Sequence, residues 1–590
     1  MYVALVQNNP TTGALKDNAD MVLKAVEALS KQPYPPDLVV FPAYALTGFP
    51  LHGLGRSAAF AAEVLDTAQR LIKEAKLPIL LGMVLPQQIP DVPGFFCEPE
   101  SLYCKDGDGG SLGFSYGTFG EDGGQETDAS YASDIRGTDM VKVKMEGLTV
   151  CIILDAYPDE TNDLRDCDLI IMQLAKDYNG ADSLFTSSQQ LGYLKEVAQM
   201  NSAWLMVSNL VGAQDDMVFD GGSLVINPEG ELIASAPVFE ESVILQNIPS
   251  LKSNGPGRAS MAVVAEAAEE ADATVEKADV VSAGVETAEA EAEAAGENGE
   301  SVSLTAGVHN GLVTPLLPYE ADWKALTVAV RDYLHKNGFT DVVIGISGGL
   351  DSAVTAVLAA DVLGSEHLHG VIMPSAHTPE SSTADAQELA EALGIKTVIL
   401  PIDGPLKAFS ELYQEQLGSL GSDLAQQNIQ ARIRMIHLMQ LANTHGWLLL
   451  NTTNKSEAAV GYSTLYGDTA GSYAPLGNIY KTDVYGLAEW RNTKQKVIPA
   501  AILTKAPSAE LFAGQLDQDT LPPYEVLDRI LKLHIEENMG IDQIIDATSS
   551  GHLLDPIDPE IIADVLHRVR VSEFKRRQEP LSPTLGPVDM

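Results

Sequence analysis

The sequence predicts an α/β protein with two large domains, and three observations lead to this prediction. Apolar, strand-like runs alternate with amphipathic, helix-like segments in both halves of the chain, as they do in layered α/β domains. A chain of 590 residues is too long to fold around one hydrophobic core. The composition changes abruptly between residues 250 and 310, where we expect a linker. We therefore predict domains at residues 1–249 and 311–590.

Residues 1–249 begin with the strand-like run YVALVQ and continue with an amphipathic helix that carries Met21, Val22, Ala25, Val26 and Leu29 on one face. Further strand-like runs are DLVVF, LPILLGMV, LTVCIILD, DLIIMQLA and AWLMVSNLVG. This alternation predicts a layered α/β domain.

Residues 261–300 hold 13 Ala, 12 Asp or Glu and a single Lys. Such a segment has too little bulky apolar surface to bury and too much charge to collapse. We expect a disordered or transiently helical, solvated linker over residues 250–310.

The second half, residues 311–590, is organised around the stretch Asp341–Ala353, DVVIGISGGLDSA. Its apolar run predicts a buried strand, Ser347-Gly348-Gly349 predicts a tight turn, and Asp351 opens a helix. Glycines let the backbone approach a ligand, and the first N–H groups of a helix attract anions, so this turn suits a polyphosphate. The P-loop spacing GxxxxGK[ST] is absent, and an ordinary strand-to-helix turn is the alternative.

Four apolar runs of this half each end on a polar segment: VVIGI on SGGLDS, GVIM on PSAHTPESSTADA, TVIL on PID, and WLLL on NTTNKSE. Ligands bind outside the carboxyl ends of the strands in an open parallel sheet. We therefore expect a doubly wound parallel sheet with all four polar segments at one crevice.

The net charge of −45 argues against nucleic acid and against an anionic membrane surface as partners. No window approaches twenty uninterrupted apolar residues, so we expect a soluble, cytoplasmic protein. The cysteines Cys97, Cys104, Cys151 and Cys167 show neither metal-ligand spacing nor a disulfide framework. We expect them to be free, buried thiols.

The hexapeptide SGGLDS resembles the pyrophosphate loop of the ATP pyrophosphatase family, whose members cleave ATP between the α and β phosphates and adenylate their substrate. Within that family the second half resembles the NAD⁺ synthetases, through MPSAHTPESSTADAQELAEALGI, QNIQARIRM, NTTNKSEAAVGYSTLYGDTAGSYAPL, TKAPSAELFAGQLDQDTLPPYEVLD and KRRQ. The first of these looks like the adenine-side segment, and the fourth looks like a mobile closing loop.

This resemblance implies ATP contacts at Ser347, Gly348, Gly349, Leu350, Asp351, Ser352, Met373 and Thr452. It implies contacts to deamido-NAD⁺ (nicotinic acid adenine dinucleotide) at Asn428, Arg432, Glu457, Tyr462, Ser463, Thr464, Leu465 and Lys575. Asp351 and Glu457 suit a Mg²⁺ that bridges phosphates, although either could be a helix-start acid placed by the helix dipole. Asp351, Lys481 and Lys505 are the candidate catalytic residues, the lysines because phosphate charge grows in the transition state. Thr453 and Gln427 depart from the family pattern, which has glycine and glutamate there.

The first half resembles the nitrilase-type amidase domain that supplies ammonia from glutamine in two-domain NAD⁺ synthetases, through VALVQNNPTTGALKDNA, DLVVFPAYALTGFP and GAQDDMVFDGGSLVINPEGELIAS. The resemblance implies an αββα sandwich and a catalytic cysteine, glutamate and lysine. Ala43 stands at the glutamate position and Ile153 at the nucleophile position, and no lysine occurs between Lys105 and Lys142. Cys151 lies two residues early, inside an apolar strand. We therefore expect a pseudo-glutaminase that cannot hydrolyse amides.

The leading hypothesis is an NAD⁺ synthetase that amidates deamido-NAD⁺ through an adenylated intermediate, using ATP with Mg²⁺ and free ammonia although its family type hydrolyses glutamine. The alternatives are a glutamine-dependent synthetase with a shifted amidase site, a GMP synthetase, a tRNA-thiolating enzyme and a non-catalytic nucleotide sensor. No cysteine follows Cys167, which argues against thiolation. The family's synthetase domains pair, so the resemblance also implies a homo-oligomer, at least a dimer.

Overall fold

The computed structural model describes residues 1–88, 95–104, 111–114, 140–145, 147–154, 164, 166–180, 188–249, 308–309, 311–549 and 556–585. Nearly all of the expected linker at residues 250–310 lies outside the described residues, as does most of the lysine-free segment between residues 105 and 142. Met1–Ile248 and Ala306–Met590 belong to one unit.

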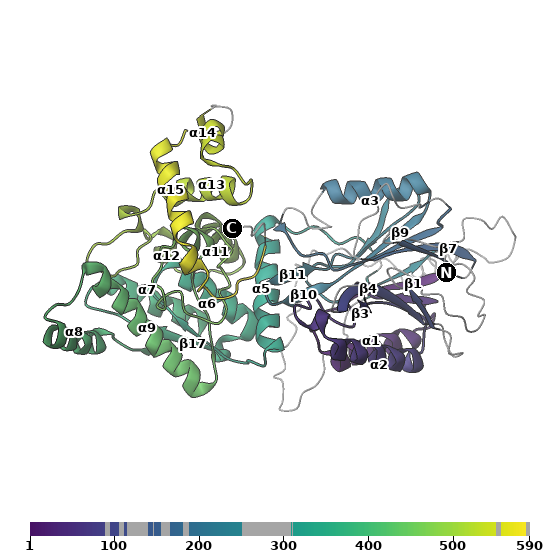
Figure 1. Ribbon diagram of the computed structural model, residues 1–590, viewed down its shortest axis with the longest axis horizontal. Helices are drawn as coiled ribbons and strands as arrows, with labels where there is room; N and C mark the ends of the chain where they lie inside the picture. Colours follow the sequence, from purple (N-terminus) through teal and green to yellow (C-terminus); the bar gives the residue numbers. More distant parts are fainter. Residues whose placement is uncertain are drawn as a thin grey trace, which may run out of the picture. The chain divides into compact units, whose positions relative to one another are not determined.

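The first half is built on two mixed sheets (Figure 1). The seven-stranded sheet has the order β15-β14-β1-β2-β3-β4-β5, and the six-stranded sheet has the order β13-β12-β9-β8-β7-β6. The first sheet consists of β1 (Tyr2–Gln7), β2 (Leu38–Val40), β3 (Ile79–Gln88), β4 (Phe95–Cys104), β5 (Ser111–Phe114), β14 (Ser242–Asn247) and β15 (Val308–His309). The second consists of β6 (Met140–Met145), β7 (Leu148–Leu154), β8 (Leu169–Leu174), β9 (Trp204–Asn209), β12 (Leu224–Ile226) and β13 (Leu232–Ser235). A separate ribbon pairs β10 (Val211–Gln214) with β11 (Met217–Asp220).

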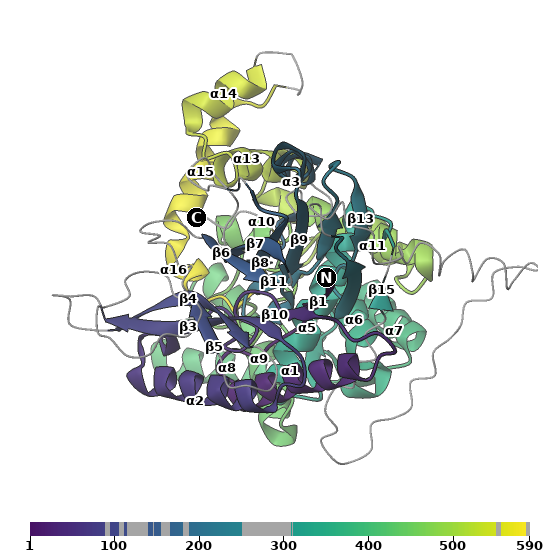
Figure 2. The same cartoon turned by 90° about the vertical axis from the view of Figure 1, so that its right-hand side faces the viewer.

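The two sheets face each other across an apolar core because alternate side chains of each strand point to the same face. Leu5 and Val40 of the first sheet share one buried cluster with Ile152 and Ile171 of the second. Helices α1 (Leu15–Ser30) and α2 (Ala58–Glu74) lie side by side along the outer face of the seven-stranded sheet (Figure 2), and α3 (Ser188–Asn201) packs on the other sheet. This arrangement is the αββα sandwich that we expected.

The second half is built on a four-stranded parallel sheet with the order β18-β17-β16-β19. Its strands are β16 (Val342–Gly345), β17 (Leu368–Ile372), β18 (Lys396–Ile399) and β19 (Leu448–Leu449). Val342 and Ile344 pack into a core with helices α5 (Pro318–Lys336), α6 (Leu350–Leu363) and α7 (Glu380–Leu393), whereas Val343 packs on α9 (Asp423–His445). Helices therefore cover both faces, and the strand order reverses at β16, as expected for a doubly wound sheet.

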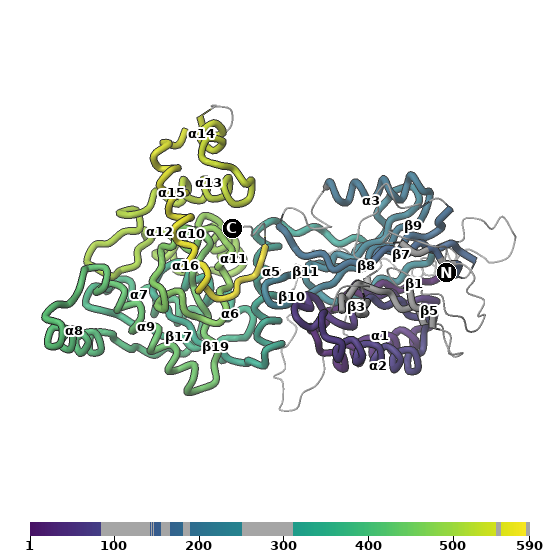
Figure 3. The backbone as a smooth tube through the Cα atoms, in the orientation of Figure 1, coloured from purple at the N-terminus to yellow at the C-terminus, as the bar shows by residue number. Residues whose placement is uncertain are grey.

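The remaining helices surround this sheet. A second cluster joins the short α10, which follows the NTTN segment, to helices near the C-terminus, and Figure 3 shows α13, α14 and α15 gathered together. The bounds are α8 (Asp403–Leu417), α10 (Lys455–Val460), α11 (Lys481–Lys494), α12 (Ala500–Thr504), α13 (Tyr524–Ile535), α14 (Ile541–Ser549), α15 (Pro559–Val571) and α16 (Glu573–Arg576). No helix among the described residues is long and apolar enough to span a membrane.

The expectation of free thiols is wrong for two of the four cysteines, because the structure joins Cys151 to Cys167 in a disulfide. Cys151 lies in β7, and Cys167 lies just before the parallel neighbour β8, separated from it by Asp168. Their Cα atoms are 6.0 Å apart, within the range that a disulfide spans. Strand pairing creates this proximity, and cysteine spacing alone does not reveal it. The Cys97 and Cys104 side chains lie outside the described residues.

Candidate active site

A cavity of about 320 Å³ lies at the carboxyl ends of the parallel strands. Its walls include the turn after β16, the segment after β17, the segment after β19 and the loop at residues 505–511. A pocket of this size, located where the strand order reverses, is where ligands bind in doubly wound folds. Three of the four polar segments thus meet as predicted.

The fourth segment, Pro401–Asp403 after β18, does not line the cavity. β18 is the edge strand, two positions from β16, so its end lies away from the reversal point. The Asp403 carboxylate instead accepts a hydrogen bond of 3.0 Å from the Ala376 N–H group. This segment therefore stabilises the loop that follows β17. The expectation that four segments converge at one crevice is corrected to three.

The turn after β16 has the form of an anion cradle. Gly348 has a φ of +77°, and a Cβ atom there would lie 2.2 Å from the Ser382 carbonyl oxygen, so only glycine fits. The Ser352 hydroxyl accepts a 3.2 Å hydrogen bond from the Ser347 N–H group and lies 3.0 Å from the Ser347 hydroxyl. Helix α6 begins directly after this turn, so its positive end faces the cavity.

A buried cluster of charges lies beside this turn. The Lys481 ammonium group contacts the Asp351 carboxylate and lies 3.1 Å from Glu457 Oε1. Burial raises the pKa of the Glu457 carboxyl; Lys481 opposes the shift, and the nearby Asp351 and Asp517 add to it. The pKa of Lys481 is raised by Asp351 and Glu457, although burial alone would lower it. The cluster thus carries more negative charge than its one lysine neutralises.

These carboxylates fit a Mg²⁺ ion of the kind that takes one or two protein carboxylates and completes its shell with phosphate and water oxygens. Asp351, Glu457 and Asp517 all line the cavity. Burial raises the pKa of the Glu457 carboxyl and the nearby Asp351 and Asp517 add to the shift, so a divalent cation here would stabilise the charged carboxylate. Among the described residues there is no cluster of three or more His, Cys, Asp or Glu side chains arranged to hold a metal alone. A cation here would therefore depend on ligands from its substrate.

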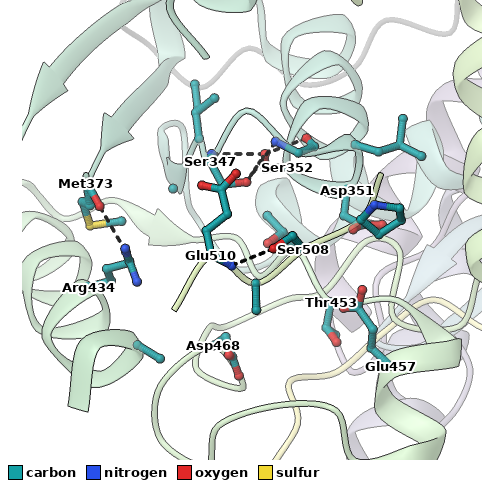
Figure 4. Close-up of a pocket in the computed structure, with 18 of the residues that line it drawn as sticks. Ser347, Asp351, Ser352, Met373, Arg434, Thr453, Glu457, Asp468, Ser508 and Glu510 are labelled. Carbon is teal, nitrogen blue, oxygen red and sulfur yellow. Dashed lines mark hydrogen bonds between the residues drawn. The ribbon is translucent and has the colours of Figure 1, made fainter. Parts of the chain in front are cut away.

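Most of the predicted ATP contacts line the cavity, and Figure 4 labels four of them, Ser347, Asp351, Ser352 and Met373. The two candidate catalytic lysines line the cavity as well. The lining residues from that prediction are Ser347, Gly349, Leu350, Asp351, Ser352, Met373 and Thr452, with Lys481 and Lys505. Thr453, which replaces the family's glycine, also lines the cavity, and its N–H group donates to Asn451 Oδ1 at 2.7 Å.

The predicted deamido-NAD⁺ contacts divide into two groups. Tyr462, Ser463 and Glu457 line the cavity. The other five are not part of the lining and instead support its wall. The Thr464 hydroxyl donates to Asn428 Oδ1 at 3.0 Å, the Arg432 guanidinium donates to the Leu465 carbonyl oxygen at 3.1 Å, and the Lys575 ammonium group donates to the carbonyl oxygens of Gly461 and Ser463 at 2.7 and 2.6 Å.

Sequence reasoning missed four charged residues of the lining: Arg434, Asp468, Glu510 and Asp517. The Arg434 guanidinium donates to the Met373 carbonyl oxygen at 3.1 Å (Figure 4). Arg434 lies three residues after Ala431, which also lines the cavity, so helical periodicity could have selected it in place of Arg432. Asp468 accepts a 2.6 Å hydrogen bond from the Thr464 N–H group, and burial raises its pKa to about 6.

Of the two positions that the amidase resemblance singles out, Ala43 follows β2 of the first sheet, whereas Ile153 lies on the face of the second sheet that packs against α3. Leu154, next to Ile153, pairs with Gln173 in the β7–β8 ladder, and the Gln173 side chain donates to the Phe41 carbonyl oxygen at 2.6 Å, two residues before Ala43. Ala43 is fully buried, and Ile153 packs in the apolar cluster beneath α3. Cys151 belongs to the same cluster, and its sulfur is bonded to Cys167.

A doubly wound sheet with a glycine turn and carboxylates at its reversal point is the architecture of nucleotide-binding α/β enzymes. Residues 322–579 match the family model described as NAD synthase. The glutamine-dependent NAD(+) synthetase of Thermotoga maritima is 35% identical over 98% of this chain and 95% of its own length, and that of Aquifex aeolicus is 32% identical over 99% and 96%. The chain therefore belongs to the glutamine-dependent NAD⁺ synthetase family.

Solved structures agree with this membership. The glutamine-dependent NAD⁺ synthetase of Acinetobacter baumannii in complex with ADP aligns with a TM-score of 0.63 and 26% identity, covering 99% of this chain and 95% of that one. The enzyme from Cytophaga hutchinsonii aligns with a TM-score of 0.70 at 16% identity and shows likeness of fold. The chain is thus an enzyme of the ligase class that forms C–N bonds, and the GMP synthetase, tRNA-thiolating and sensor alternatives are set aside.

Proposed function

We propose that this enzyme makes NAD⁺ from deamido-NAD⁺, ATP and free ammonia, and that its first half does not hydrolyse glutamine. The observation that carries the synthetase part is the joining of the glycine turn, Asp351, Glu457 and Lys481 in one cavity. The ammonia part rests on the hydrocarbon side chains of Ala43 and Ile153.

Catalysis in such a site is mainly positioning and charge neutralisation. A carboxylate oxygen of the pyridine ring substituent forms a bond to the α-phosphorus of ATP, and the bond to the β-phosphate oxygen breaks as pyrophosphate leaves. Ammonia then attacks the activated carbonyl carbon, and AMP leaves with the bonding electron pair while the new amide nitrogen loses a proton. The N–H groups at Gly349 and α6 would hold pyrophosphate oxygens, and Lys481 would meet charge that grows on the leaving phosphates.

A Mg²⁺ ion held by Asp351 and Glu457 would neutralise phosphate charge as it accumulates. Lys505 reaches the same cavity from the loop after α12, so it would add a second positive charge once that loop has closed over substrate. Tyr462 and Ser463 line the wall where we expect the second nucleotide, and Lys575 holds that wall through its hydrogen bonds to residues 461 and 463.

The loss of glutaminase activity is supported from two sides. Amide hydrolysis by this route needs a thiolate that forms a bond to the amide carbon and a base that takes the thiol proton. Ile153 and Ala43 supply neither. Cys151, the nearest sulfur in sequence, is fully buried and bonded to Cys167, so in this state it has no thiol that could lose a proton to form the attacking thiolate. A shifted amidase site at Cys151 is therefore disfavoured.

A structural role for residues 1–249 is supported by their packing on α5. Tyr178, Val218 and Phe239 share one buried cluster with Leu326 and Val330 of that helix. We expect that removing residues 1–249 would expose this apolar face and make the remaining chain aggregate. Size-exclusion chromatography with light scattering tests this, and a soluble, active fragment of residues 311–590 would contradict the structural role.

A dimer through the second half is supported by apolar side chains left exposed on β18, α8 and α9. Leu417 is 73% exposed and Leu424 is 63% exposed, and Val398 and Ile399 lie open on the edge strand. Edge strands and large apolar patches of this kind are usually covered by another chain, here a second copy.

The proposed reaction is tested by supplying ATP, deamido-NAD⁺ and ammonium and measuring NAD⁺, AMP and pyrophosphate. We expect the three products in equal amounts. Formation of ADP and inorganic phosphate in place of AMP and pyrophosphate would contradict the adenylated intermediate.

A further inference from the structure

Glu510 projects from the loop after α12 into the cavity. In Figure 4 its side chain points toward Ser347 and Ser352 of the glycine turn. Glu510 Oε1 accepts a 2.5 Å hydrogen bond from the Ser382 hydroxyl and lies 3.3 Å from the Lys505 ammonium nitrogen. A carboxylate is therefore held at the edge of the cavity that the anion cradle faces.

Ser382 ties this carboxylate to the cradle itself. The Ser382 carbonyl oxygen lies so close to Gly348 that a Cβ atom there would be 2.2 Å away, so the Ser382 backbone touches the turn. Its buried hydroxyl donates to Glu510 and accepts a 2.5 Å hydrogen bond from Lys505. One side chain thus joins the phosphate turn to both charged residues of the loop.

Lys505 is fully engaged in this arrangement. Besides Ser382 and Glu510 it faces Asp385 Oδ2 at 3.5 Å, so one ammonium group stands between two carboxylates. Lys505 cannot keep these contacts and also bind phosphate at full strength, because the two carboxylates offset its charge. An arriving phosphate group would also be repelled by the Glu510 carboxylate.

The backbone at Glu510 is held in an uncommon conformation. Its φ of +51° lies in the left-handed region, which residues other than glycine seldom adopt. Neighbouring contacts impose this conformation: the Glu510 N–H group donates to the Ser508 hydroxyl at 3.1 Å, and Gln430 donates to the Leu511 carbonyl oxygen at 3.0 Å. Strained residues that their surroundings hold in place are typical of segments that switch.

We propose that Glu510 is an internal placeholder for a phosphate group: its carboxylate stands at the cradle in the ligand-free enzyme, and the polyphosphate of the nucleotide displaces it. This inference rests on the proposed use of ATP. Displacement separates Lys505 from Glu510. The binding of the phosphate group therefore also makes the Lys505 ammonium group available to contact that phosphate. Glu510 thereby sets the affinity for nucleotide, and Ser382 is a positioning residue that acts through Glu510 and Lys505.

The test is equilibrium binding of ATP with Mg²⁺ to full-length Glu510→Gln, measured by calorimetry without deamido-NAD⁺. The apparent affinity for ATP equals the intrinsic affinity multiplied by the fraction of molecules whose cradle Glu510 does not occupy. Because Glu510→Gln raises this fraction, we expect the variant to bind ATP about tenfold more tightly than the wild type. In steady-state assays KM for ATP should fall while KM for deamido-NAD⁺ stays the same. Glu525→Gln, an exposed glutamate on α13, is the matched control and should leave ATP binding unchanged.

Ser382→Ala gives a second measure, because it removes the hydroxyl that holds Glu510 and keeps the backbone contact with Gly348. We expect tighter ATP binding in this variant as well, whereas Ser382→Thr, which retains a hydroxyl, should behave as the wild type does. Melting temperatures of all variants would show that each is folded.

Weaker ATP binding by Glu510→Gln would show that Glu510 contacts the bound nucleotide or its metal, and equal binding would show that it has no part in affinity; either result overturns the placeholder. Pyrophosphate is the second probe. If neither the wild type nor Glu510→Gln binds ATP, but Glu510→Gln binds pyrophosphate more tightly than the wild type does, the placeholder stands and the proposed use of ATP falls. Binding of neither anion by either protein would overturn both.

Discussion

Asp351 and Glu457 reach the same lysine from helices that are far apart in the sequence, α6 and α10. If they hold a Mg²⁺ ion against the phosphates, Asp351→Asn and Glu457→Gln should each lower turnover at least ~100-fold, because these near-isosteric changes remove charge at the reacting phosphates. The expected readout is kcat measured over a range of Mg²⁺ concentrations. Near-normal kcat in both variants would mean that the metal site lies elsewhere, and Glu366→Gln, an exposed residue beyond the end of α6, is the control.

The buried Asp468 predicts a specific dependence of stability on pH. Burial raises its pKa from 3.8 to about 6, so between these values the unfolded state loses the proton before the folded state does. As the pH rises through this window, the folded state should lose up to ~3 kcal/mol of stability relative to an Asp468→Asn variant. Melting temperatures of both proteins from pH 4 to pH 7 should therefore diverge, with the variant gaining on the wild type. A constant difference across this range would contradict the raised pKa.

At the scale of single residues, sequence reasoning found the groups that follow strands and missed those that depend on helix orientation and loop docking. Ser347, Asp351 and Thr452 come soon after the ends of β16 and β19, and the sheet brings them to one cavity. Arg432 and Arg434 differ by two positions on α9, and only the packed helix shows that Arg434 is the one that lines the cavity. Glu510 reaches the cavity through a left-handed backbone that its sequence does not predict.

At the scale of elements, the turn between β16 and α6 is fixed by Gly348. Alanine there would combine a left-handed φ with a Cβ atom 2.2 Å from the Ser382 carbonyl oxygen, so the turn or α7 must move. We expect Gly348→Ala to lower kcat/KM for ATP by a factor of at least ~10, because a shift of the turn displaces the N–H groups that would face phosphate. Gly404→Ala is the matched control, because a Cβ atom at Gly404 meets no atom within 4 Å. Equal effects of the two changes on kcat/KM would show that the turn does not bind phosphate.

The elements themselves were largely predictable, since apolar runs bounded by turn residues gave β1, β2, β7, β8, β16 and β17 close to their observed bounds. The apolar runs do not reveal the order in which the strands lie side by side in a sheet. The placement of β18 at the edge removed Pro401–Asp403 from the cavity, and the adjacency of β7 and β8 brought Cys151 to Cys167. The corrections for Pro401–Asp403 and for Cys151 both depend on the order of strands within a sheet. Packing decides this order, and the sequence of a single strand does not show it.

At the scale of the whole molecule, α5 connects the two halves through polar contacts as well as apolar ones. The Lys336 ammonium group donates to Asn9 Oδ1, the Pro10 carbonyl oxygen and the Ala213 carbonyl oxygen at 2.9, 3.0 and 2.7 Å. Asp332 of the same helix accepts from Asn9 and from the Ala213 N–H group, both at 2.7 Å. These contacts explain how the first half, which we propose does not hydrolyse glutamine, can still contribute to the fold of the second half.

The central claim is that this member of a glutamine-dependent family uses free ammonia. The most direct measurement compares NAD⁺ formation with ammonium and with glutamine at equal nitrogen, with glutamine freed of contaminating ammonia. We predict NAD⁺ formation with ammonium and none above background with glutamine, because Ile153 offers no atom that can attack the amide. Efficient synthesis from glutamine would contradict the claim, and its loss in Cys151→Ser would identify Cys151 as the nucleophile.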